Sequence, residues 1–188
     1  MPDVLELPKK RNLYFQKTVD QASIGELTQQ IIDISGNDEY LKNLYKIHGL
    51  DYTPQPIKIY IDSYGGYIYQ CFGLVSVMER CTTPIHTIVT GCAMSAGFII
   101  LVSGHKRYAH RLSTPMYHQA SNGFFGKVKD MEDDLAETVR LQKMMEEIVS
   151  KRTKITKKKL KEIYTTKTDW TMNADEALKL GVVDEILQ

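Results

Sequence analysis

The chain has 188 residues, of which 43% are hydrophobic and 25% charged, as expected of one soluble globular domain with a sizeable core. Its formal net charge of +1 gives no overall field that would attract nucleic acid, and its longest apolar run, near residues 98–102, is far too short to span a bilayer. The start of the chain lacks the apolar core of a signal peptide, and the three cysteines fit neither a metal site nor a disulfide framework. We therefore expect a cytoplasmic protein with no metal, cofactor, nucleic-acid or membrane partner.

The N-terminal part of the sequence predicts an arm, a strand and a helix. Residues 1–12 contain two prolines and a basic cluster, which favour a short irregular arm, and residues 12–15 are aromatic and typical of a strand. From 23 to 34, apolar residues recur at helical spacing. Ser23 followed by Glu26 has the pattern of a helix N-cap with a capping box, so we expect the helix to begin there.

Residues 36–56 have a different composition. They are polar, rich in tyrosine and lysine, and end in two prolines. Such a stretch is typical of an inserted surface segment, with a short helix around residues 40–47. We expect residues 13–188 to form a single domain around this insertion.

The middle of the chain repeats one order of elements. Residues 57–61 alternate like a strand, the Gly65-Gly66 turn follows, and an apolar helical stripe runs to residue 80. A second β-branched strand over residues 85–89 again leads into a glycine-rich turn and an apolar helix. This repeated order predicts an α/β fold whose site lies at the ends of strands.

Ser95 lies in the second of these turns, between small residues and glycines. The first N–H groups of a helix have no partner within the helix, so they can hold a negatively charged oxygen. A nucleophilic serine needs such donors, together with small neighbours that let a substrate backbone approach. On its own, this stretch favours a serine packed at a helix start over a nucleophile.

Two residues further along the chain could complete a catalytic group. His118 lies in a strand-like apolar run, where an unpaired imidazole would be unusual, and Asp169 lies in a connector before a capped helix. A serine nucleophile needs a base to take its proton, and the base needs a carboxylate to fix its tautomer. Sequence spacing cannot prove this grouping, and four other histidines compete as the base: His48, His86, His105 and His110.

The C-terminal third begins with a long helix. Residues 127–152 carry an apolar stripe, which indicates packing along a large face or against a partner. The strongly basic residues 151–161 lack interleaved aromatic residues, so we interpret them as a solvated helix end rather than a nucleic-acid site. Asn173 with Glu176 predicts a capped short helix before a last strand.

Four stretches together carry a resemblance to a known family: residues 60–66 (Tyr-Ile-Asp-Ser-Tyr-Gly-Gly), 91–97, 116–119 and 169–187. Each is weak alone, but all four occur in order and near the family's spacing. The chain resembles the ClpP-like serine peptidases, the proteolytic subunit family of the Clp protease within the crotonase-like superfamily. The resemblance implies an α/β fold built as a repeated β-β-α superhelix, with a protruding handle of a strand and a long helix at about residues 120–152.

The resemblance also implies roles for five residues. Ser95 would be the nucleophile, His118 the general base and Asp169 its orienting carboxylate, with the N–H groups of Gly66 and Ala96 forming the oxyanion hole. The implied activity is that of a serine endopeptidase. It would cleave extended or unfolded polypeptides inside a ring-shaped homo-oligomer of stacked rings.

The sequence departs from the family pattern in places. The arm before the first strand is shorter than the family's axial gate, which puts an AAA+ unfoldase partner in question. Tyr64 and Ala120 replace prolines, and Thr168 stands where many members carry an arginine that links the rings. Two alternatives stay open: a non-catalytic ring subunit that serves assembly, and a crotonase-type acyl-CoA enzyme. The latter would need an acidic base, and Asp62 is the only carboxylate in the glycine-turn motifs.

Overall fold

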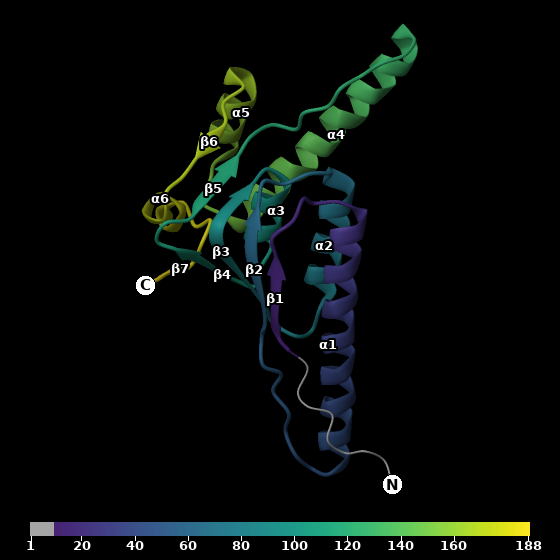
Figure 1. Cartoon of the computed structure of the whole chain (residues 1–188), viewed down its shortest axis with the longest axis vertical. Helices are drawn as coiled ribbons and strands as arrows, with labels where there is room; N and C mark the ends of the chain where they lie inside the picture. Colours follow the sequence, from purple (N-terminus) through teal and green to yellow (C-terminus); the bar gives the residue numbers. More distant parts are fainter. Residues whose placement is uncertain (1–9) are drawn as a thin grey trace.

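A parallel β-sheet forms the centre of the molecule (Figure 1). The computed structural model describes residues 10–188. Five strands follow one another across the sheet: β1 (Asn12–Phe15), β2 (Ile57–Ser63), β3 (Ile85–Met94), β4 (Lys106–His110) and β7 (Glu185–Leu187). β5 (Thr114–Tyr117) pairs with β3 and, antiparallel, with β6 (Trp170–Thr171), whereas the other strand pairs are parallel. The predicted α/β class is therefore confirmed.

Helices flank the sheet. They are α1 (Gln21–Ile47), α2 (Ile68–Arg80), α3 (Ala96–Val102), α4 (Val128–Arg152), α5 (Lys157–Thr166) and α6 (Ala174–Lys179). In Figure 1, α1 and α2 lie on one side of the strands and α5 and α6 on the other. Residues of β2 alternate between the two faces: Ile57, Ile59 and Ile61 are fully buried, whereas Lys58 is exposed. All seven residues of α3 are buried, so this helix forms the centre of the core.

The start of α1 differs from the sequence prediction. Asp20, not Ser23, is the N-cap residue. The Asp20 carboxylate accepts a hydrogen bond from the Ser23 N–H, and the Ser23 hydroxyl accepts one from the Asp20 N–H. Since this exchange satisfies two donors at the helix start, the capping box begins three residues earlier than we predicted.

The surface segment expected over residues 36–56, with a short helix over residues 40–47, contains more helix than we predicted. Helix α1 continues without a break to Ile47, for 27 residues in all. The reason lies at Asp38, which is only 3% exposed and accepts hydrogen bonds from three side chains, those of Arg11, Tyr52 and Thr83. These bonds tie the extended helix to the chain on both sides of it.

The predicted N-terminal arm is described only in part. Residues 1–9 lie outside the described residues. Arg11 is bound to Asp38, and Asn12 already belongs to β1, where it pairs with Lys58. The last residues assigned to the arm are therefore part of the folded body.

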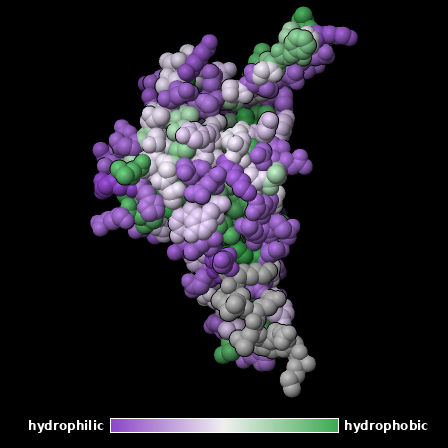
Figure 2. Space-filling model, in the orientation of Figure 1, coloured by the Kyte–Doolittle hydropathy of each residue, from purple (hydrophilic) through white to green (hydrophobic). Residues whose placement is uncertain are grey.

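The long helix α4 projects from the body (Figure 1). Its buried side chains all lie in its second half, from Leu141 onward. Residues 118–127, which precede it, are irregular rather than a strand, because an extended segment needs a neighbouring strand to form a ladder. Apolar side chains gather at the projecting tip (Figure 2), where Phe125 is fully exposed and Val128 is 69% exposed.

The central strand β3 changes its neighbour along its length. Residues 86–89 pair with β4, and residues 92–94 pair with β5. On its other side the register with β2 shifts between Ile61 and Ser63. We call this change of neighbour the fork in β3. The last residues of β3 follow it and lead directly into the turn that holds Ser95.

Candidate active site

Ser95 occupies the turn between β3 and α3, as the sequence predicted. Its backbone has φ 54° and ψ −120°, a conformation that is uncommon outside glycine. Its N–H donates to the Met116 carbonyl at 3.0 Å, which joins the turn to β5. A serine on a strained strand-to-helix turn resembles the nucleophile elbow of other hydrolases, which exposes the hydroxyl at the edge of a sheet.

The glycine turn packs directly against this serine. Gly65 has φ +98°, and a Cβ added to it would lie 2.6 Å from the Met94 carbonyl oxygen and 2.8 Å from the Ser95 Cβ. Only glycine fits so close to the neighbouring backbone in this conformation. The two turns that the sequence singled out are therefore in contact.

His118 lies immediately after β5 and faces Ser95. Its Nε2 is 2.8 Å from Ser95 Oγ, and its Nδ1 is 3.1 Å from an Asp169 carboxylate oxygen. With a proton on Nδ1, the ring donates to the carboxylate and Nε2 can accept the serine proton. The three side chains thus stand in the order that acyl transfer requires.

β5 and β6 bring the imidazole and the carboxylate together. Tyr117 is paired with Trp170 across the antiparallel ladder, so the residues that adjoin this pair, His118 and Asp169, also lie opposite one another. The His118 side chain is 24% exposed, whereas that of Asp169 is 72% exposed. The carboxylate is therefore held by little besides its histidine contact.

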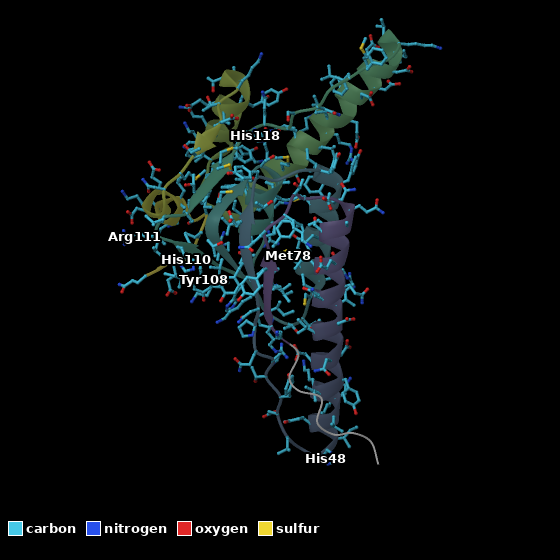
Figure 3. All side chains as sticks on the ribbon, in the orientation of Figure 1. His48, Met78, Tyr108, His110, Arg111 and His118 are labelled. Carbon is cyan, nitrogen blue, oxygen red and sulfur yellow. The ribbon has the colours of Figure 1, made fainter. Side chains whose placement is uncertain are left out.

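The competing histidines lie elsewhere. Figure 3 shows His48 at the far end of α1 and His110 near the C-terminal edge of the sheet, both well away from His118. His105 Nδ1 accepts the Ile85 N–H at 2.9 Å, and the His86 ring packs against Tyr108. The structure therefore leaves His118 as the base that faces Ser95.

The two predicted oxyanion donors flank the serine. Ala96 is the first residue of α3, so its N–H has no carbonyl partner within that helix. The bridge between Val19 and the glycine turn uses the Gly65 carbonyl and the Tyr67 N–H, which leaves the Gly66 N–H outside this bridge. Both N–H groups remain candidates for holding a developing oxyanion.

Asp62 forms its hydrogen bond with the backbone of β3 and not with Ser95, His118 or Asp169. Its carboxylate accepts the Cys92 N–H at 3.0 Å, at the point where the β2–β3 register shifts. A Cβ on Gly91 would lie 2.4 Å from the same carboxylate. Asp62 therefore substitutes for a ladder bond, which disfavours its use as the base of an acyl-CoA enzyme.

Sequence reasoning missed Gln142. Its side chain is 5% exposed on α4, its Oε1 accepts the Ala120 N–H at 2.7 Å, and its Nε2 donates to the Tyr117 hydroxyl at 3.3 Å. Burial raises the pKa of Tyr117 to about 12, so this hydroxyl stays protonated at neutral pH. The available signal was a polar residue at helical spacing with Met145 and Val149, which are buried.

Residues 10–188 contain no group of three or more histidine, cysteine, aspartate or glutamate side chains that could hold a metal ion. Their cysteines are all free. None of the helices in this range is both long and apolar enough to cross a membrane.

Comparison with known proteins gives consistent matches. The family model described as Clp protease matches residues 6–188. The ATP-dependent Clp protease proteolytic subunit of Deinococcus radiodurans is 34% identical over 135 residues, which are 71% of this chain and 65% of the relative. The ATP-dependent Clp protease proteolytic subunit 2 of Bacillus licheniformis is 35% identical over 133 residues, which are 70% of this chain and 69% of the relative. The match to the Deinococcus protein thus spans slightly less than two thirds of its length.

Proposed function

The chain belongs to the Clp protease family, and on this premise we propose that it is a serine endopeptidase that cleaves extended or unfolded polypeptides. The observation that carries the proposal is the pair of distances at His118: 2.8 Å to Ser95 Oγ and 3.1 Å to Asp169. The family match supports the same activity, because the matched relatives are named as protease subunits.

The reaction begins with the Ser95 hydroxyl. His118 Nε2 takes the hydroxyl proton as Oγ attacks the scissile carbonyl, and Asp169 stabilises the imidazolium and keeps the ring oriented. The carbonyl oxygen becomes an oxyanion, which the N–H groups of Gly66 and Ala96 stabilise. His118 then protonates the leaving amine, and an acyl group stays on Ser95.

Water completes the cycle. His118 takes a proton from a water molecule, which attacks the acyl carbonyl while the same two N–H groups hold the second oxyanion. Collapse of this intermediate returns the proton from His118 to Ser95 Oγ and releases the new carboxyl end of the peptide. Each residue thus acts twice, and none needs a cofactor.

We also propose that the protein works as a ring-shaped homo-oligomer of stacked rings. The support is the apolar tip of the handle, since Phe125, Val128 and Leu135 are more than half exposed in a single chain. Apolar surface of this kind is typical of a contact with another subunit. The matched relatives are named as subunits of an ATP-dependent protease.

The test is labelling with a fluorophosphonate, followed by mass spectrometry of the adduct. We expect one phosphonyl group on Ser95, no labelling of Ser95→Ala, and cleavage of a fluorogenic peptide that falls by about 10⁴–10⁶ in that variant. Light scattering on the same sample reports assembly. An assembled protein that is not labelled would identify a non-catalytic ring subunit instead, and an adduct on another residue would overturn the assignment of Ser95.

A further inference from the structure

The peptide that carries His118 is bound by one side chain on both of its flanks. Gln142 Oε1 accepts the N–H of Ala120, two residues after His118, and Gln142 Nε2 donates to the hydroxyl of Tyr117, the residue before it. Gln142 lies in the buried half of α4 and is 5% exposed. A single amide thus binds the side chain of the residue before the imidazole and the main chain two residues after it.

The surroundings fix which way this amide points. Nε2 also donates to the Glu146 carboxylate at 2.7 Å, one helical turn further along α4. A carboxylate can only accept and the Ala120 N–H can only donate, so the nitrogen faces Glu146 and the oxygen faces Ala120. The three partners together hold the amide in one orientation.

The backbone at His118 has few other supports. β5 ends at Tyr117, its partner β6 is two residues long, and residues 118–127 form no strand. On the N-terminal side the chain is held by the Met116 carbonyl, which accepts the Ser95 N–H. On the C-terminal side, the bond from Ala120 to Gln142 is the first contact that fixes the main chain.

We propose that Gln142 is a positioning residue for His118. It holds the Tyr117 side chain on one flank of the imidazole and the Ala120 main chain on the other, so that Nε2 stays within reach of Ser95 Oγ. This inference rests on the proposed function of His118 as the general base. Gln142 touches neither the serine nor the carboxylate, and it acts only through Tyr117 and Ala120. A displacement of about 1 Å at a reacting group can cost about 10²-fold in rate.

The first experiment replaces the amide by an apolar side chain of similar size, Gln142→Leu. We expect kcat for a fluorogenic peptide and the rate of fluorophosphonate labelling to fall together by about 10²-fold, with KM nearly unchanged. The labelling rate matters because a small probe needs the serine and its base but not a bound peptide strand. The matched control is Lys143→Ala, at the exposed neighbouring position on α4, which should behave as wild type.

A second pair of variants separates positioning from a general loss of stability. Gln142→Glu keeps the acceptor for Ala120 but sets a second carboxylate against Glu146, so we expect a loss of similar size. The double variant Gln142→Glu with Glu146→Gln exchanges the two side chains. The amide introduced at position 146 can then donate to the carboxylate introduced at position 142, and the Tyr117 hydroxyl can donate to the same carboxylate. The double variant should recover most of the labelling rate.

The outcomes are distinct. If the wild-type protein is not labelled, the proposed function itself fails. If the wild type is labelled and folded Gln142→Leu reacts at the same rate, the positioning role is wrong. If Gln142→Leu does not fold, the exchange pair decides: a folded double variant as slow as Gln142→Glu alone would overturn the proposal.

Discussion

The two halves of the candidate site are built in different ways. Ser95 stands on the backbone of the central strand, above a fully buried helix and against Gly65, where no Cβ would fit. His118 follows a strand of four residues, and its partner Asp169 is 72% exposed beside a strand of two. The nucleophile half, around Ser95, is fixed by the main chain and close packing. The base half, around His118 and Asp169, is fixed by individual hydrogen bonds.

This difference predicts how each half fails. A change in the nucleophile half has to move buried backbone, so stability and activity should fall together. A change in the base half removes a hydrogen bond near the surface, so activity should fall while the fold persists. The predictions that follow test this separation, beginning with the largest effect.

Asp169→Asn tests the base half. An amide can donate where the carboxylate only accepts, so it favours the wrong imidazole tautomer, and turnover should fall by about 10⁴-fold. The thermal midpoint should hardly change, because the side chain is mostly exposed. Peptide cleavage and thermal unfolding are measured on the same preparation.

The matched control for this variant is Asp175→Asn, an exposed carboxylate on α6 whose side chain is 65% exposed. It should leave both quantities unchanged. Wild-type turnover in Asp169→Asn would show that another group orients His118. A large loss of stability would instead contradict the separation between the two halves.

Gly65→Ala tests the nucleophile half. The new Cβ would lie 2.6 Å from the Met94 carbonyl oxygen at φ +98°, so the two turns would have to move apart. We expect the free energy of unfolding to fall by about 2 kcal/mol or more, and the labelling of Ser95 to be lost in the fraction that stays folded. Chemical denaturation and fluorophosphonate labelling measure the two effects.

Gly73→Ala provides the control, since Gly73 lies inside α2 and its added Cβ would meet nothing within 4 Å apart from its chain neighbours and the adjacent backbone of its own helix. This change should stabilise the protein by about 0.5–1 kcal/mol and leave labelling unchanged. A Gly65→Ala variant with wild-type stability and reactivity would show that the turn has room to adjust.

Asp38→Asn tests a third region, the part of α1 that lies in the expected surface insertion. The change weakens the bonds from Arg11, Tyr52 and Thr83, so we expect about 2 kcal/mol less stability at neutral pH and an unchanged kcat. Asp51→Asn, in the exposed segment after α1, is the control. A fall in kcat without unfolding would link α1 to the site.

The effect of Asp38→Asn should depend on pH. Burial opposes ionisation of Asp38, but hydrogen bonds from Arg11, Tyr52 and Thr83 outweigh it and lower its pKa. The folded-state pKa is therefore below the unfolded value of about 3.9, so the stabilisation is complete above that pH and is lost as pH falls through the folded value. The difference between wild type and variant should be full at pH 7 and shrink in acid.

Local signals in the sequence were sufficient where neighbours decide the structure. The strand, turn and helix around Ser95 were predicted from a few adjacent residues, and so was the cap at Asn173, which exchanges hydrogen bonds with Glu176. The continuation of α1 was not predictable in this way. It depends on Asp38 and partners as distant as Thr83, 45 positions further along the chain.

The base half shows the same limit. Residue types suggested His118 and Asp169, but their meeting depends on the ladder between Tyr117 and Trp170, which the sequence does not reveal. The sequence shows Gln142 as a polar residue in an apolar stripe. It does not show the hydrogen bond that Gln142 accepts from the Ala120 N–H, 22 positions away. Side chains that act through a distant backbone group leave only a weak local signal.

The fork in β3 has a consequence for motion in the sheet. Thr90 and Gly91 lie after the last residue paired with β4 and before the first paired with β5, where the register with β2 also shifts. The middle of the most central strand is therefore its least protected part, and local opening should expose the Gly91 amide to hydrogen exchange sooner than that of Ile88. This joint lies four residues before Ser95, so local opening would reach the edge of the nucleophile half while residues 86–89 keep their register with β4.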